Sequence, residues 1–232
     1  MYISLDRIDV QLSPRDGKPR LIQTDHRLAS EVAERPGLST IAALIRCLNP
    51  RRMYPDAEVF YSCAHEPPAF LREAVMLCGA AVVVGDDLSV VERPFHGRVG
   101  DAEEIDRVAN AALDGLVGAL LSDSTSSEFG LLVKREAALF RDGFPSEDDD
   151  VRFWTAVLEL GALAGSAVRM AKAGSWFYDR EAIGTTPFNF RCSFDRGPAT
   201  ANLFGKAVKF LRACGGGDEP SALVKLLVAK AS

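Results

Sequence analysis

The stretch EVFYSCAHEPPAFLREAVMLCGAAVVVGDD, residues 58–87, decides the fold of this chain. It begins with an apolar run that is typical of a buried strand, and two prolines then open an apolar helix over 69–78. A second β-branched run at 81–84 leads into the polar turn at 85–87. A strand, a helix and a strand in this order predict two neighbouring parallel strands, whose polar ends emerge at the same edge of a sheet.

The residues before this unit add a hairpin and two helices. Alternating apolar residues and a strong turn signal predict the hairpin, and capping residues and apolar periodicity predict the helices. The expected elements are strands over 2–12 and 19–23, a helix over about 24–34, and a helix from Ser39 that Asn49-Pro50 ends. We therefore predict that residues 1–95 form a small mixed sheet with helices packed on it.

The composition changes near residues 93–101, where Pro94, Gly97 and Gly100 fall close together. Beyond this point helical periodicity dominates, with a single strand expected at 188–194. The predicted helices cover 101–121, 129–140, 151–172, 200–213 and 221–229. The fold class is thus mixed α+β, with a helix-rich second part at 100–232 that has one or two strands. The sequence leaves open whether the two parts share one core.

The composition also excludes several classes of protein. The 232 residues are 47% hydrophobic and carry a net charge of −5, which suits a chain that buries a sizeable core. Lys and Arg do not gather into a basic stripe, so nucleic-acid binding is not expected. No run reaches the roughly 18 uncharged apolar residues of a membrane span, and the N-terminus lacks the pattern of a signal peptide.

Cysteine and histidine usage predicts neither a metal site nor a disulfide framework. The five cysteines are widely spaced and contain no Cys-x-x-Cys pair, and the three histidines lie far apart. The glycine run at 215–217 follows a helix and lacks the Gly-Lys-Ser/Thr of a phosphate loop, so no cofactor is predicted. A reduced, cytoplasmic, bacterial-type protein is the simplest interpretation.

The expected sheet edge gathers the residues that are best suited to catalysis. Cys63, His65 and Glu66 end the first strand of the unit and are expected to lie near Asp86, which ends the second. A thiol, an imidazole and carboxylates are the groups of nucleophilic catalysis. The plainer interpretation is a structural turn. Because the prolines that open the following helix have no N–H groups to donate, a phosphate site at this point is not favoured.

A second candidate is the aromatic segment at 176–190. Trp176, Tyr178, Phe188 and Phe190 combine apolar area with polar handles, which suits either a contact surface or a loop folded over a core. In the helix before it, Gly161 and Gly165 share one face, which favours close packing over a ligand groove. The arrangement of Leu160-Gly161, Gly165, Gly174 and Trp176 is similar to segments of uncharacterised bacterial proteins, a short resemblance that implies no activity.

Taken alone, the sequence favours a non-catalytic protein that binds a protein partner or associates with itself, with the aromatic segment as the contact surface. The main alternative is a hydrolase or transferase acting through Cys63, His65, Glu66 and Asp86. A small-ligand sensor that uses the same sheet edge without chemistry is the third possibility.

Overall fold

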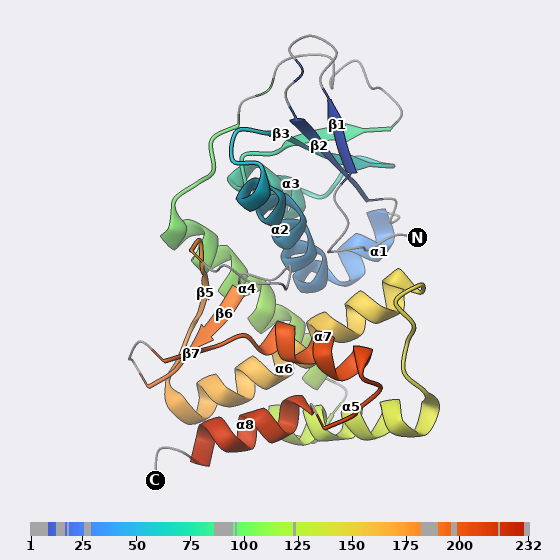
Figure 1. Ribbon diagram of the computed structural model, residues 1–232, viewed down its shortest axis with the longest axis vertical. Helices are drawn as coiled ribbons and strands as arrows, with labels where there is room; N and C mark the ends of the chain where they lie inside the picture. Colours follow the sequence, from blue (N-terminus) through green and yellow to red (C-terminus); the bar gives the residue numbers. More distant parts are fainter. Residues whose placement is uncertain are drawn as a thin grey trace.

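The computed structural model describes most of the chain. The described residues are 9–12, 17, 19–25, 29–85, 95, 97–122, 124–181, 190–195, 199–217 and 219–229. Within them the chain forms eight helices and two small sheets, which confirms the predicted mixed α+β fold class. Figure 1 shows the larger sheet at one end of the molecule and the helix-rich part at the other.

The larger sheet has the strand order β1-β2-β3-β4. Its first two strands form the predicted antiparallel hairpin, and β3 and β4 are parallel to each other, as residues 58–87 predict. Strand β3 also pairs parallel with β2. The strands are β1 (Asp9–Leu12), β2 (Pro19–Asp25), β3 (Glu58–Cys63) and β4 (Ala81–Val84). The helices between them are α1 (Ala29–Glu34), α2 (Pro36–Met53) and α3 (Ala69–Leu77). Helices α2 and α3 pack together beside this sheet (Figure 1).

Helix α2 differs from the prediction at both ends. It begins at Pro36 rather than Ser39, because proline suits the first position of a helix. The prediction that Asn49-Pro50 ends it is wrong, since the helix continues to Met53. A proline this close to the end removes only one helical hydrogen bond, and residues 38–49, which precede it, are all buried, so packing stabilises the helix that leads into Pro50.

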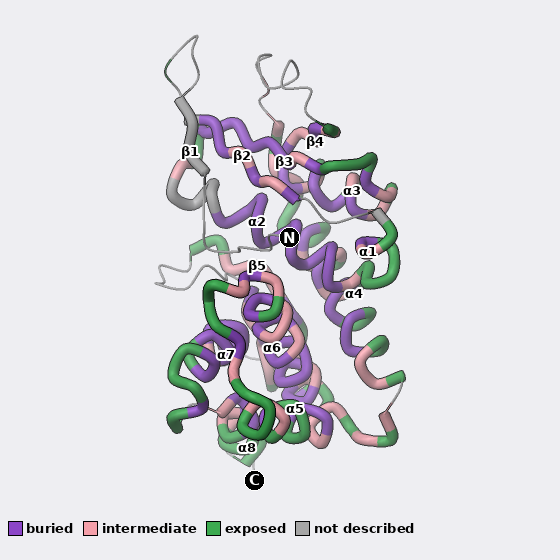
Figure 2. The backbone as a smooth tube through the Cα atoms, turned by 90° about the vertical axis from the view of Figure 1, so that its right-hand side faces the viewer, coloured by how far each residue is buried: buried purple, intermediate pink, exposed green. Residues whose placement is uncertain are grey.

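The second part of the chain is built around one central helix. Helix α6 contacts α4, α5, α7 and α8, and it is buried along most of its length (Figure 2). These helices are α4 (Ala102–Leu121), α5 (Glu128–Asp142), α6 (Asp150–Lys172), α7 (Leu203–Arg212) and α8 (Pro220–Ala229). By length and composition α6 could cross a membrane, but 67% of its most apolar window is buried inside the protein, which is the pattern of a core helix.

The two glycines of α6 serve close packing, as predicted. A Cβ atom on Gly161 would lie 2.2 Å from a ring carbon of Phe204, and one on Gly165 would lie 1.9 Å from a ring carbon of Trp176. The two rings are themselves stacked, with centroids 5.1 Å apart. Both glycines therefore admit aromatic rings onto the helix surface.

A small antiparallel sheet packs beside α6. It consists of β5 (Trp176–Tyr178), β6 (Phe190–Ser193) and β7 (Thr200–Ala201). Only β6 was expected, and the helix expected from residue 200 begins instead at Leu203 because Thr200 and Ala201 pair with β6. Most of the buried apolar residues of both parts of the chain belong to one contiguous cluster, and Phe60 and Val83 of the larger sheet form a second, smaller one.

Side chains of α4 hold the free edge of β5. Asn110 accepts from the Trp176 N–H at 3.0 Å and donates to the Trp176 carbonyl at 2.7 Å, as a neighbouring strand would. Asp106 accepts from the Tyr178 N–H at 2.7 Å. Burial raises the pKa of Asp106 above its ordinary value, and this hydrogen bond lowers it in part. Helix α4 thereby ties the small sheet to the rest of the fold.

Candidate functional site

The carboxyl ends of the parallel strands lie together, as predicted. Asp25 at the end of β2 pairs with Cys63 at the end of β3, which in turn pairs with Val84 of β4. His65 and Glu66 follow β3 and are exposed. The edge thus brings together three of the four predicted catalytic residues, while Asp86 lies outside the described residues.

The geometry of these side chains does not build a catalytic relay. Cys63 is only 7% exposed. Glu66 forms an ion pair with Arg72 of α3, so its carboxylate is engaged by a guanidinium. The cavity at this edge, lined by Cys63, His65 and Glu66 among others, has a volume of only about 10 Å³. It has room for one water molecule at most.

A buried polar cluster, which the sequence analysis missed, lies beneath this edge. The hydroxyl of Tyr61 donates to the carboxylate of Asp25, and both residues are fully or almost fully buried. Arg46 of α2 donates to the Thr24 carbonyl, and its guanidinium lies 5.8 Å from the centre of the Tyr61 ring. Within the described part of the chain, Nε and Nη1 of Arg46 have no hydrogen-bond partner. The sequence signal for this cluster is Arg46 itself, the one charged residue within the apolar run 41–48.

The burial of the five cysteines predicts which thiol reacts in the native protein. Native protein treated with a thiol reagent should label one cysteine rapidly, because Cys214 is exposed and the other four are buried. Burial also raises the pKa of Cys192 to about 12, which suppresses its thiolate. The measurement is the number of thiols that react in native buffer and in urea.

The matched variants identify the reacting thiol. Cys214→Ser should abolish rapid native labelling, and Cys63→Ala should leave it unchanged. A second rapid equivalent that disappears in Cys63→Ala would contradict a buried Cys63 and would favour the enzyme alternative.

The aromatic segment is not arranged as the expected contact surface. Trp176 and Phe190 are 1% and 0% exposed, so both rings belong to the core. Tyr178 is half-buried and packs on Phe190 with ring centroids 5.3 Å apart. Phe188 lies outside the described residues. The aromatic residues of this segment that the structure describes therefore serve the fold.

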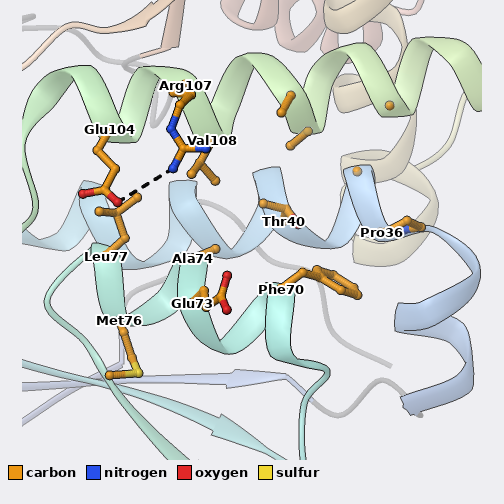
Figure 3. A pocket seen from close by; sticks show the side chains of 14 residues that line it. Pro36, Thr40, Phe70, Glu73, Ala74, Met76, Leu77, Glu104, Arg107 and Val108 are labelled. Atoms are coloured by element: carbon orange, nitrogen blue, oxygen red, sulfur yellow. Dashed lines mark ion pairs between the residues drawn. The ribbon is translucent and has the colours of Figure 1, made fainter.

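An open groove lies elsewhere, between α3, α4 and the start of α2. Its volume is about 590 Å³, and its lining is mainly apolar. Figure 3 shows Leu77, Ala74 and Thr40 between the helices, with Phe70 and Pro36 toward one end. At the other end Met76 is 60% exposed, the most exposed large apolar side chain of α3.

The shape of the groove follows from the spacing of its lining residues. On α4 the lining extends from Glu104 to Gly115 at helical spacing, which corresponds to about 16 Å along the helix axis. Gly37 fixes one end, because a Cβ atom there would lie 2.4 Å from the backbone oxygen of Ala112. By contrast, a Cβ atom on Gly115 would meet nothing within 4 Å, so the groove is open above it.

The charged side chains of the groove are unequally distributed. Glu73 lines it on the α3 side, and Glu104 and Arg107 line it on the α4 side (Figure 3). Nη2 of Arg107 lies 3.8 Å from Oε1 of Glu104, and the two side chains are 72% and 55% exposed, so this ion pair is weak. The half of the groove farther from Pro36 therefore carries the charge, and the half near Phe70 is apolar.

No protein-family model, no curated protein and no solved structure matches this chain. Among the residues that the structure describes, no group of three or more His, Cys, Asp or Glu side chains is placed to hold a metal ion. The geometry of the chain's own residues is therefore the basis for inferring its function.

Proposed function

We propose that this protein is a non-catalytic binding domain that holds an amphipathic helix of a partner protein in the groove between α3 and α4. The open apolar groove of about 590 Å³ is the observation that carries the proposal. Helix-binding domains use such a groove to bury the apolar face of a partner helix, whose anchor residues recur every third or fourth position.

The dimensions of the groove suit a helix better than a compact ligand. Its α4 wall alone extends over about three helical turns, and it is open along its length. Ala111, Ala112 and Gly115 are small, so a helix backbone can approach α4 closely, while Met76 is a flexible side chain that adapts to an apolar partner. The strand edge, with its cavity of about 10 Å³, offers no comparable space.

The test uses a defined peptide and two matched variants. A fluorescein-labelled, side-chain-stapled, alanine-rich peptide of about 12 residues, with leucines along one face, provides a stable helix of the required length. We call it the neutral peptide. Fluorescence anisotropy should show saturable binding to the full chain, and a scrambled peptide of the same composition should bind more weakly.

Gly115→Leu should weaken binding of the neutral peptide at least about tenfold, because the new side chain fills the groove. Gly118→Leu is the control. Gly118 lies on the same helix, has nothing within 4 Å of its Cβ position and does not line the groove. The affinity of the Gly118→Leu protein for the neutral peptide should therefore stay within about twofold of the wild-type value. Absence of saturable binding, or equal weakening by both variants, would overturn the proposal. A different result would indicate a small-ligand site instead. In that case no peptide binds, but a small apolar probe binds to the wild-type protein and to Gly118→Leu and not to Gly115→Leu.

A further inference from the structure

We infer that the helix that binds in this groove is basic in the half that faces Glu73 and Glu104. The inference rests on the proposed function and specifies the chemistry of the partner. Of the charged side chains that line the groove, two are carboxylates and one is a guanidinium.

Glu73 is the more informative of the two acids. It is exposed in the middle of α3, and within the described part of the chain its carboxylate has no ion-pair or hydrogen-bond partner. An acidic residue in the first turn of a helix, such as Glu104 in α4, is stabilised by the helix dipole. That explanation does not apply to Glu73, which is the fifth residue of α3 and lines the groove (Figure 3).

The charges also give the groove a direction. Glu104 and Arg107 lie at the end near Leu77, whereas Phe70 and Pro36 lie at the other end (Figure 3). A helix that places a lysine or arginine opposite Glu73 and Glu104, and apolar residues opposite Phe70, matches both halves. In the reverse orientation its cation would lie against the aromatic end and its leucines against the carboxylates. Complementary charges of this kind favour one partner orientation more than they raise affinity.

Three peptides of the same length test the inference. The basic and acidic peptides carry two lysines or two glutamates at one end of the neutral peptide. The basic peptide should bind about tenfold more tightly than the acidic one at low salt, as expected for exposed ion pairs. The difference should shrink in about 1 M NaCl, where the Debye length is about 3 Å.

Variants show whether the groove is the source of the preference. Glu73→Lys should remove most of the advantage of the basic peptide, whereas Glu103→Lys, on an exposed residue of α4 that does not line the groove, should remove much less. Equal binding of all three peptides, or a preference that Glu73→Lys leaves intact, would overturn the inference and leave the proposed function standing. If no peptide binds, the proposed function itself fails.

Discussion

Replacing Gly165 by alanine should lower the free energy of unfolding by about 3 kcal/mol, because overpacking a tight core is strongly destabilising. The new Cβ atom would lie 1.9 Å from a ring carbon of Trp176, and this indole is 1% exposed and stacked on Phe204. Gly161→Ala should behave similarly, since its Cβ atom would meet Phe204 itself at 2.2 Å. Urea denaturation followed by circular dichroism measures both changes.

Replacing a glycine of α4 by alanine should instead increase the free energy of unfolding. Gly115 and Gly118 lie inside a helix, and a Cβ atom on either would meet nothing within 4 Å. Each change to alanine should therefore raise the free energy of unfolding by about 0.5–1 kcal/mol, the usual advantage of alanine over glycine in a helix. A Gly165→Ala protein as stable as the wild type, or a clearly less stable Gly115→Ala protein, would show that the packing around α6 or α4 differs from the one described.

Trp176→Ala should be at least as damaging, with a loss of about 3–5 kcal/mol. The indole is 1% exposed, stacks on Phe204 and fills the surface that Gly165 leaves open. Thermal unfolding is the measurement, and for a chain of this length a loss of this size corresponds to a decrease of roughly 6–20 °C in Tm. The backbone hydrogen bonds between β5 and Asn110 do not compensate, because they do not involve the indole.

Met76→Ala is the matched control for Trp176→Ala. Its side chain is 60% exposed, so its truncation should change the free energy of unfolding by less than about 0.5 kcal/mol. A folded, fully stable Trp176→Ala protein with an altered oligomeric state would instead return Trp176 to the role of a surface contact.

The local architecture could be predicted where the local sequence pattern and the tertiary packing favour the same secondary structure. The β-branched runs and the proline-started helix of residues 58–87 gave the parallel pair, since a strand, helix and strand rarely pair otherwise. The close packing of Gly161 and Gly165 also followed from their spacing on one helix face. The end of α2 was predicted wrongly at Pro50, because the effect of a proline on a helix also depends on the burial of the residues before it, and residues 38–49 are all buried.

The small sheet and the groove were harder to predict, because both depend on contacts between residues far apart in the chain. Strand β5 is held by Asp106 and Asn110 of α4, more than 60 residues earlier in the chain, and no local pattern announces such a partner. The groove likewise depends on tertiary structure, because it lies where α3 and α4 do not pack closely against each other. Ala111 and Gly115 of α4 are small and exposed and line the groove, but small residues are common on exposed helix faces and do not by themselves indicate a groove.

The most direct test of the groove as the binding surface is an NMR titration of the isotopically labelled full chain with the neutral peptide. We expect amide shifts to change in α3, in α4 between Glu104 and Gly115, and at the start of α2, and to stay unchanged at Cys63 and His65. Changes centred on Cys63 and His65, or no saturable change anywhere, would contradict the assignment of function to this groove.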